Sequence, residues 1–300
     1  MRKKGFVLMV CLSVLLLLPG LNKAEEEKPD SKKITFGAKL TGGLNYLSVG
    51  DWNTSMRSET EQLGDWASSV GAAMEGGFEN IHWGMDFEGE MIIYITPRFG
   101  ITIGSGYIQG SKGPDAHKIT ITQPTLTNTI TFDTKVSAIP IIVGVCYSLP
   151  ISSKARLVLN GGLGYYFARL SSTYQNEEDG YAVHGWFIEK ATGRGLGFQG
   201  GAGFEFDIAK NIAFVVEGFG RYAKIGGFEG DWKELNSNGY SYSVNGTSYY
   251  YEWLSSETGN WYPTVVISDV EPSGAGVRNV REARVDFSGF MLRVGIRIRF

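Results

Sequence analysis

The chain has 300 residues, including 41 Gly, 17 Phe, 15 Tyr and 7 Trp. The Gly content is about twice the usual share of roughly 7%, and Gly destabilises a helix interior by about 1 kcal/mol relative to Ala, so the composition argues against a helical bundle. The 28 Lys and Arg residues against 31 Asp and Glu leave a net charge of −3, which argues against a nucleic-acid-binding protein.

The first 24 residues (1–24) are predicted to be a secretory signal peptide. The chain begins with a positively charged region, Met1-Arg2-Lys3-Lys4, and an apolar run follows from Phe6 to Leu18. Ala24 is a small residue of the kind found at signal-peptide cleavage sites. The apolar run is shorter than the roughly 20 residues that a membrane-spanning helix needs. We expect residues 25–33 to be a short periplasmic segment and residues 34–300 to form the folded domain.

Eight segments of this domain alternate apolar side chains with polar or small ones. Such alternation over about 9 to 11 residues is typical of transmembrane strands, because one face meets lipid and the other the lumen. Since an even number of antiparallel strands can close, the pattern predicts an all-β, up-and-down transmembrane barrel of eight strands. The segments are residues 34–46, 85–95, 99–107, 138–148, 156–167, 198–206, 212–222 and 290–300.

The connections between these segments alternate strictly between long and short. Bacterial outer-membrane barrels have short periplasmic turns and long extracellular loops. We therefore expect both termini to lie in the periplasm, and Pro140 in the fourth segment to mark a bulge or a break in the ladder. The short connections are residues 96–98, 149–154 and 209–211, and the long ones are about 48–84, 110–134, 171–194 and 224–284.

A soluble β-sandwich or a lipocalin-like barrel would also show alternating strands. Here the second face is largely Gly, Thr and charge, which suits a narrow lumen better than a face exposed to water. Tyrosines near the strand ends are expected to form an aromatic girdle at the membrane interface, unless they are simply strand formers. They are Tyr46, Tyr94, Tyr107, Tyr147, Tyr165 and Tyr222, of which Tyr94 has the wrong parity for a lipid-facing position.

The last segment ends in Phe300 with an apolar residue at every second position before it. In this respect the chain resembles the outer-membrane β-barrel superfamily of Gram-negative bacteria, and most closely the eight-stranded OmpA/OmpX-type domain. The resemblance implies an outer-membrane location in the cell envelope, contact with outer-membrane lipid and lipopolysaccharide, and recognition by the barrel-assembly machinery. The residues that would form the assembly signal are Phe290, Leu292, Val294, Ile296, Ile298 and Phe300.

The inward face carries equal numbers of positive and negative residues. An eight-stranded barrel is about filled by its own side chains, and buried charges need partners. We therefore expect a salt-bridged, closed barrel that acts as a structural or surface-binding protein, with a small porin or channel as the alternative. The predicted lumen charge network consists of Lys39, Asp86, Glu88, Glu90, Arg156, Glu205, Glu217, Arg221, Arg293 and Arg297.

The long loops are expected to carry any recognition of a surface ligand, whose identity the sequence does not give. Asn245-Gly246 lies between alternating runs and predicts a hairpin turn, and residues 119–121 and 130–132 predict a second hairpin around Pro124. These hairpins could instead span the membrane, which would give ten strands. All seven Trp lie in the predicted loops, where we expect them to pack the loops together rather than bind a partner.

The sequence indicates no catalytic residues. None of the three His neighbours an Asp, as the rim of an omptin-type protease would require, and none begins a His-x-Ser motif of the kind expected in a lipid A deacylase. Cys146 would be the only cysteine after signal cleavage, which excludes an intramolecular disulfide. We expect no cofactor and no metal site.

Overall fold

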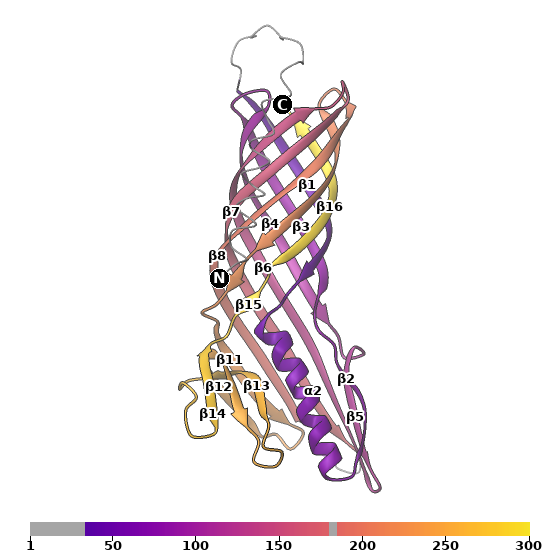
Figure 1. Cartoon of the computed structure of the whole chain (residues 1–300), viewed down its shortest axis with the longest axis vertical. Coiled ribbons are helices and arrows are strands. Elements are labelled where there is room, and N and C mark those ends of the chain that lie inside the picture. The colour runs from indigo at the N-terminus through magenta and orange to yellow at the C-terminus, as the bar shows by residue number, and fades with distance from the viewer. Residues whose placement is uncertain (1–33, 180–184) are drawn as a thin grey trace. The chain divides into compact units, whose positions relative to one another are not determined.

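The computed structural model describes residues 34–179 and 185–300, and the predicted signal peptide and the segment 25–33 lie outside this part of the chain. The described residues form sixteen strands and one helix (Figure 1). The elements are β1 (Thr35–Leu47), α2 (Asp51–Ser69), β2 (Ala73–Phe78), β3 (Trp83–Tyr94), β4 (Phe99–Lys112), β5 (His117–Gln123), β6 (Leu126–Pro150), β7 (Ala155–Glu178), β8 (Gly185–Ala209), β9 (Ile212–Tyr222), β10 (Lys224–Ile225), β11 (Glu229–Asn236), β12 (Ser241–Leu254), β13 (Trp261–Ser268), β14 (Val277–Glu282), β15 (Val285–Asp286) and β16 (Gly289–Arg299).

Eight strands pair antiparallel into a closed ring in the order β1, β3, β4, β6, β7, β8, β9 and β16, and β16 pairs back onto β1. Each predicted spanning segment lies largely within one strand of this ring. The predicted total of eight strands is wrong, because the described residues hold sixteen. The other eight lie in the connections that we expected to be loops.

The three strands β6, β7 and β8 have 24 or 25 residues each and continue past the ring. Beyond the ring, β5 pairs with β6 and β2 with β5, while β11 pairs with β8, β12 with β11, and β13 and β14 with β12. We call α2, β2, β5, β10 to β15 and the distal ends of β6 to β8 the surface module. The long connections are therefore folded, which corrects the expectation of loops.

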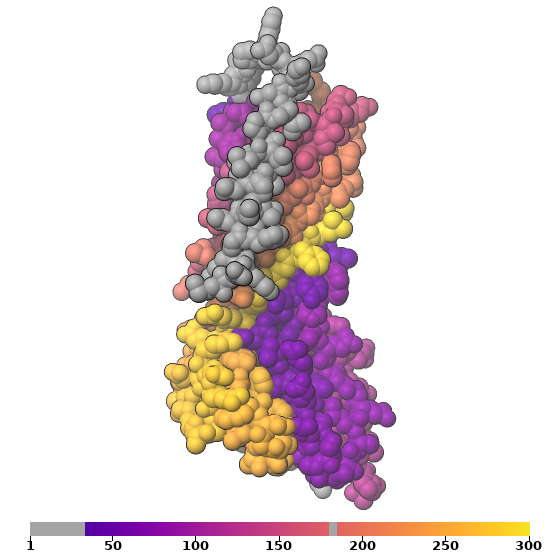
Figure 2. Space-filling view, in the orientation of Figure 1, coloured from indigo at the N-terminus to yellow at the C-terminus, as the bar shows by residue number. Residues whose placement is uncertain are grey.

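Helix α2 closes the surface module. It packs against β2 on one edge of the curved sheet and against β13 near the other. Figure 2 shows the residues of α2 beside the orange and yellow residues of β11 to β14, covering this side of the module. The largest cluster of buried apolar residues, which includes Trp52, Met56, Ile119, Ile130 and Phe132, lies mainly between the helix and the inner face of the sheet.

The first turn of α2 is held by specific polar contacts. Gly50 precedes the helix with φ 66°, a backbone conformation that Gly adopts without strain. Asp51 accepts hydrogen bonds from Arg281 and from the backbone N–H of Arg284, and a carboxylate in the first turn also complements the helix dipole. Among the described residues, no helix is long and apolar enough to cross a membrane.

Asn53 connects α2 to the chain that enters β3. Its Nδ2 donates to the carbonyl oxygens of Ser48 and Ile81, each at 2.9 Å, and its Oδ1 accepts from the backbone N–H of Ile81 at 2.9 Å. The side chain is buried, so these groups have little access to water. Composition alone could not reveal this helix, because its buried face includes Asn53, Ser55 and Ser58 beside the apolar residues.

The two hairpin predictions have opposite outcomes. Residues 119–121 pair with residues 128–130 around Pro124, which confirms that hairpin. The turn predicted at Asn245-Gly246 is wrong, since both residues lie inside β12, opposite Asp231 and Gly230. Gly is needed there because a Cβ would approach the carbonyl oxygen of Ser268 to 2.0 Å. The hairpin strands lie outside the ring, so they do not extend it to ten.

Pro140 interrupts the ladder as predicted. The pairs between β4 and β6 run to Ser105 with Ile141 and resume at Ile108 with Ala138, without a change of register. The hydroxyl of Ser105 donates to the carbonyl oxygen of Pro140 at 2.9 Å. The break is therefore local and the ring stays closed.

We predict that Asn53→Ala destabilises the surface module by about 2 kcal/mol or more, because the substitution leaves buried backbone groups of Ile81 without partners. Urea unfolding followed by tryptophan fluorescence measures the effect. Thr54→Ala, which removes a single helix-internal hydrogen bond to Gly50, is the matched control. Equal unfolding midpoints for the two variants would contradict the role of Asn53.

Candidate functional site: a charged lumen and an aromatic cavity

The outer face of the ring is apolar although it is exposed. Leu40 on β1 and Leu292 on β16 are 70% and 63% exposed, and outward side chains of β3, β4 and β6 to β9 are similar. Soluble proteins rarely expose an apolar surface that is continuous around a whole barrel. The outward residues of β16 and the C-terminal residue include all six of the predicted assembly signal, Phe290, Leu292, Val294, Ile296, Ile298 and Phe300.

The polarity of β6 reverses along its length while its pairing with β7 stays in one register. From Ile130 to Ala138 the apolar residues point inward and are buried, whereas from Ile139 to Val145 the exposed apolar residues are those that point outward. The same reversal occurs on β7 between Leu170 and Leu163. The apolar outward face of the ring therefore ends between the ring and the surface module.

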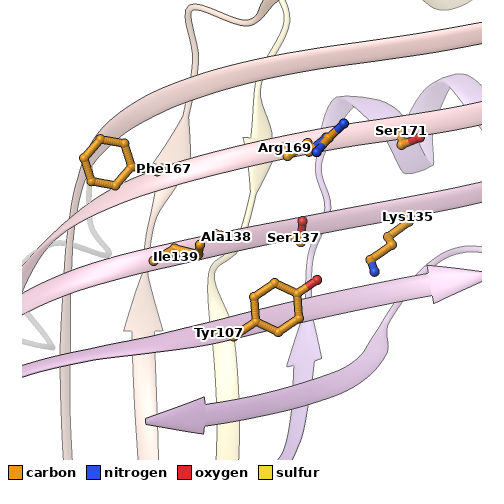
Figure 3. A pocket seen from close by; sticks show the side chains of 8 residues that line it. All are labelled: Tyr107, Lys135, Ser137, Ala138, Ile139, Phe167, Arg169 and Ser171. Atoms are coloured by element: carbon orange, nitrogen blue, oxygen red, sulfur yellow. The ribbon is translucent and has the colours of Figure 1, made fainter. Parts of the chain in front are cut away.

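Basic residues lie on the outer face at this boundary. Figure 3 shows Lys135, Ser137 and Ile139 along β6 beside Arg169 and Phe167 on β7. With other neighbours they line a depression of about 360 Å³. Lys135 and Arg169 form no ion pair with an acidic residue of the described chain. Arg169 follows the outward Phe167 on β7, and on β6 Ser137 lies between Lys135 and the outward Ile139.

Aromatic residues mark the same boundary on other strands. Tyr46 stacks on Phe290 with ring centroids 5.2 Å apart and meets Trp83 edge to face at 5.6 Å. Tyr94 does not belong to a girdle, as its parity in the sequence indicated, because it is buried inside the ring. Its parity in β3 places it inward, where its hydroxyl accepts a hydrogen bond from Arg297 Nη1 at 3.0 Å.

Arg293 is central to the charged lumen. Its Nη1 lies 2.8 Å from Glu88 Oε2, and its Nε lies 3.3 Å from Asp86 and 3.9 Å from Glu217. The Arg293 side chain is completely buried. Its guanidinium also lies over the ring of Phe219, 4.7 Å from the centroid, so the charge is surrounded on several sides.

Lys39 and Arg221 extend the network on either side. Lys39 Nζ lies 2.7 Å from Glu90 and 2.9 Å from Glu217, and Arg221 Nη1 donates to Asp86 at 2.8 Å. Because Asp86 and Glu217 are each shared between two cations, the pairs form one connected network. Coupled, buried ion pairs of this kind are strongly destabilised when one member is removed.

The remaining predicted lumen residues lie nearer the short turns. Arg297 pairs with Glu205 at 2.5 Å. Arg156 pairs with Asp207 and is less buried, so it belongs to the end of the ring rather than to its centre. The structure thus gives each of the ten predicted residues an ionic partner.

Sequence reasoning missed three uncharged residues and one acid of this lumen. Gln199 donates a hydrogen bond to Glu88 at 3.2 Å, and the ring of Phe219 lies under the Arg293 guanidinium. Tyr94 accepts a hydrogen bond from Arg297, and Asp207 forms an ion pair with Arg156. Strand parity was the signal that could have placed them. A cavity of about 10 Å³ lies among Glu88, Glu90 and their neighbours, which is room for about one water.

The surface module contains a second feature, which we call the aromatic cavity. It lies between α2 and the inner face of the sheet and measures about 350 Å³. Phe132, Tyr174, Phe187 and Trp232 form a continuous row of ring contacts, with neighbouring centroids 4.8 to 5.5 Å apart. The lining residues are Trp52, Ser55, Met56, Glu59, Phe132, Ser172, Tyr174, Phe187, Glu189, Trp232, Tyr251, Thr264, Val265 and Val266.

Two carboxyl groups, Glu59 on α2 and Glu189 on β8, line this cavity. Burial raises the pKa of both, and the neighbouring Glu59 carboxylate further raises the pKa of Glu189, to about 8. No cation of the described chain pairs with either group. Both side chains are partly exposed, so the cavity is open to solvent.

The described residues hold no group of three or more His, Cys, Asp or Glu side chains that could bind a metal ion. They also bring no nucleophile and base together in either feature. The lumen has the geometry of a structural network, whereas the aromatic cavity has room for a small molecule.

No protein-family model matches the chain, and no curated protein matches it in sequence. Solved structures that align with it include the outer membrane protein OprG from Pseudomonas aeruginosa, at 7% identity and a TM-score of 0.40, over 90% of this chain and 97% of that one. A major outer membrane protein from Thermus thermophilus aligns at 12% identity and a TM-score of 0.42, over 89% and 100%. The outer membrane protease OmpT from Escherichia coli aligns at 11% identity and a TM-score of 0.29, over 93% and 99%. At these values the likenesses identify neither a function nor a site.

We predict that Arg293→Met destabilises the barrel by roughly 3 to 5 kcal/mol, because three buried carboxylates lose a shared partner. The temperature at which the folded band on a gel converts to the unfolded band should fall clearly. Arg156→Met, at the more exposed end of the ring, should lower it much less. A similar decrease in both variants would contradict a central role of Arg293.

We predict that Glu189→Gln stabilises the surface module at alkaline pH. The folded protein keeps the Glu189 proton up to about pH 8, whereas the unfolded chain loses it near pH 4.5. Between these values the folded state binds more protons, so its stability falls as pH rises. The urea midpoints of the wild type and the variant should therefore agree near pH 4 and differ most above pH 8. Glu61→Gln, on the exposed face of α2, should show no such divergence.

Proposed function

We propose that this protein is an outer-membrane β-barrel that is closed to solute diffusion and that holds a folded binding module at the cell surface. The observation that most strongly supports the membrane location is the reversal of polarity along β6 and β7 at constant register. The whole outer surface of a soluble protein is in contact with water, so its outward side chains are not expected to change from polar to apolar along one strand. A strand that leaves a bilayer must make this change.

The lengths of the connections support one orientation in the membrane. The surface module lies on the side opposite the short turns, and in bacterial barrels the larger connections are extracellular. Both ends of the described chain lie at the short turns, where Phe300 N–H donates to the carbonyl oxygen of Phe36 and Arg299 N–H to that of Asn211. We therefore propose that these ends face the periplasm and the surface module faces outward.

The lumen supports a closed anchor over a channel. The central side chains are buried, paired with one another and separated by little free volume. The outward apolar face would contact outer-membrane lipid, and Lys135 and Arg169 would lie at the level of the phosphates of lipopolysaccharide. From the pattern of the last strand we also propose that the barrel-assembly machinery recognises residues 290–300. On the same pattern we propose that the ring is similar to the OmpA/OmpX-type domain.

Purified protein in planar bilayers should show no large, stable conductance steps, since the salt-bridged side chains fill the ring. A general porin in the same bilayer is the positive control. The unboiled protein should also migrate faster than the boiled one and fractionate with the outer membrane. Reproducible large steps would favour the channel, and a soluble protein without a mobility shift would contradict both functions.

A further inference from the structure

We propose that the aromatic cavity binds an organic cation, namely an ammonium group on a small apolar body, with Glu59 and Glu189 as its counter-charges. This inference deepens the proposed function, because it assigns a ligand class to the surface module. The residues involved lie in the surface module and take no part in the ion-pair network of the ring. Its observations are the cavity itself, the two unpaired carboxyl groups and the aromatic walls.

Among the described residues, the two glutamates of the cavity lack a cationic partner, which is unfavourable for acidic groups in such a place. A carboxylate that is partly removed from water among aromatic side chains is destabilised unless a positive charge accompanies it. In the lumen of the same protein the central carboxylates each have an Arg or Lys within 3.3 Å. Glu59 and Glu189 have none in the described chain, although they face the same cavity. A cationic ligand would provide the missing charge.

The walls have the chemistry that favours such a ligand. Aromatic faces attract cations, and rings of this kind recognise quaternary ammonium groups. Phe187 stacks on Trp232 with a 5.5 Å centroid separation, and Tyr174 lies edge to face with Phe187 at 5.0 Å. Other walls come from α2, β6, β12 and β13, so the ligand would contact residues distant in sequence.

Trp52 adds an independent observation. It lines the cavity and is only 4% exposed, and its indole Nε1 has no hydrogen-bond acceptor in the described chain. A buried donor without an acceptor is destabilising. A ligand with a hydroxyl or carbonyl oxygen beside its ammonium group would satisfy this donor as well as the two acids.

Choline and its neutral isostere 3,3-dimethylbutan-1-ol form a matched pair of probes, since they have the same shape and differ in charge. Calorimetric titration of the full protein in nanodiscs should detect binding of choline and at least about tenfold weaker binding of the isostere. Glu189→Gln and Glu59→Gln should each weaken choline binding about tenfold, and Trp52→Phe should weaken it less. Glu61→Gln should leave the affinity unchanged.

The pH dependence provides a further readout. Choline keeps its charge at every pH. Its affinity should therefore rise between about pH 6.5 and pH 9, because the fraction of Glu189 that is ionised increases over this range. The other titratable groups that line the cavity are Glu59, Tyr174 and Tyr251, and burial raises the pKa of both tyrosines further above this range. The rise should therefore be smaller in Glu189→Gln, where Glu59 is the remaining carboxyl group of the cavity.

Equal binding of choline and the isostere, or binding of Ca²⁺ without binding of choline, would overturn the proposal. Absence of binding by a protein that still shows the heat-dependent mobility shift would overturn it too, while leaving the membrane anchor intact. Loss of that shift, by contrast, would be a failure of the proposed function. The two proposals are thus separated by measurements on the same sample.

Discussion

The structure depends on the pairing of charges inside a narrow ring. An eight-stranded ring has room for its own side chains and little else, and the central ones here are ionised or polar. Asp86 and Glu217 are each shared by two cations, and Arg293 joins three acids. Because the members of this network come from β1, β3, β9 and β16, it holds these strands in one relative arrangement. It also explains why the lumen has almost no free volume.

The outward face of the ring and the inward face of the surface module are the two apolar surfaces of the molecule. They lie on opposite sides of the same strands, and β6 passes from one to the other between Ala138 and Ile139. Past this boundary β6, β7 and β8 continue into an open sheet whose inner face is covered by α2, which packs against β2 and β13. The aromatic cavity remains where this cover does not fill the space.

The strands of the ring could be predicted because outward and inward side chains alternate along each strand and differ in polarity, so the signal is local. The inward parity of Lys39, Glu88 and Arg293 followed from it, although their individual partners did not. Helix α2 could not be predicted in the same way, since its stability comes from tertiary contacts such as those of Asn53 with Ile81. The sequence suggested that Gly246 lies in a turn, but glycine is required there because the backbone of Ser268 approaches too closely for a side chain. Glu189 was not identified because its segment was expected to be a loop.

The most direct test of the inverted polarity is the environment of spin labels on the outward face. With Cys146 replaced by Ser, single cysteines at Leu40, Leu163 and Leu292 can be labelled in the reconstituted protein, with Glu61 and Lys233 of the surface module as references. We expect oxygen, which concentrates in lipid, to relax the first three labels more than a water-soluble nickel complex does, and the references to show the reverse. Labels at the three leucines that respond mainly to the nickel complex would contradict a lipid-embedded ring.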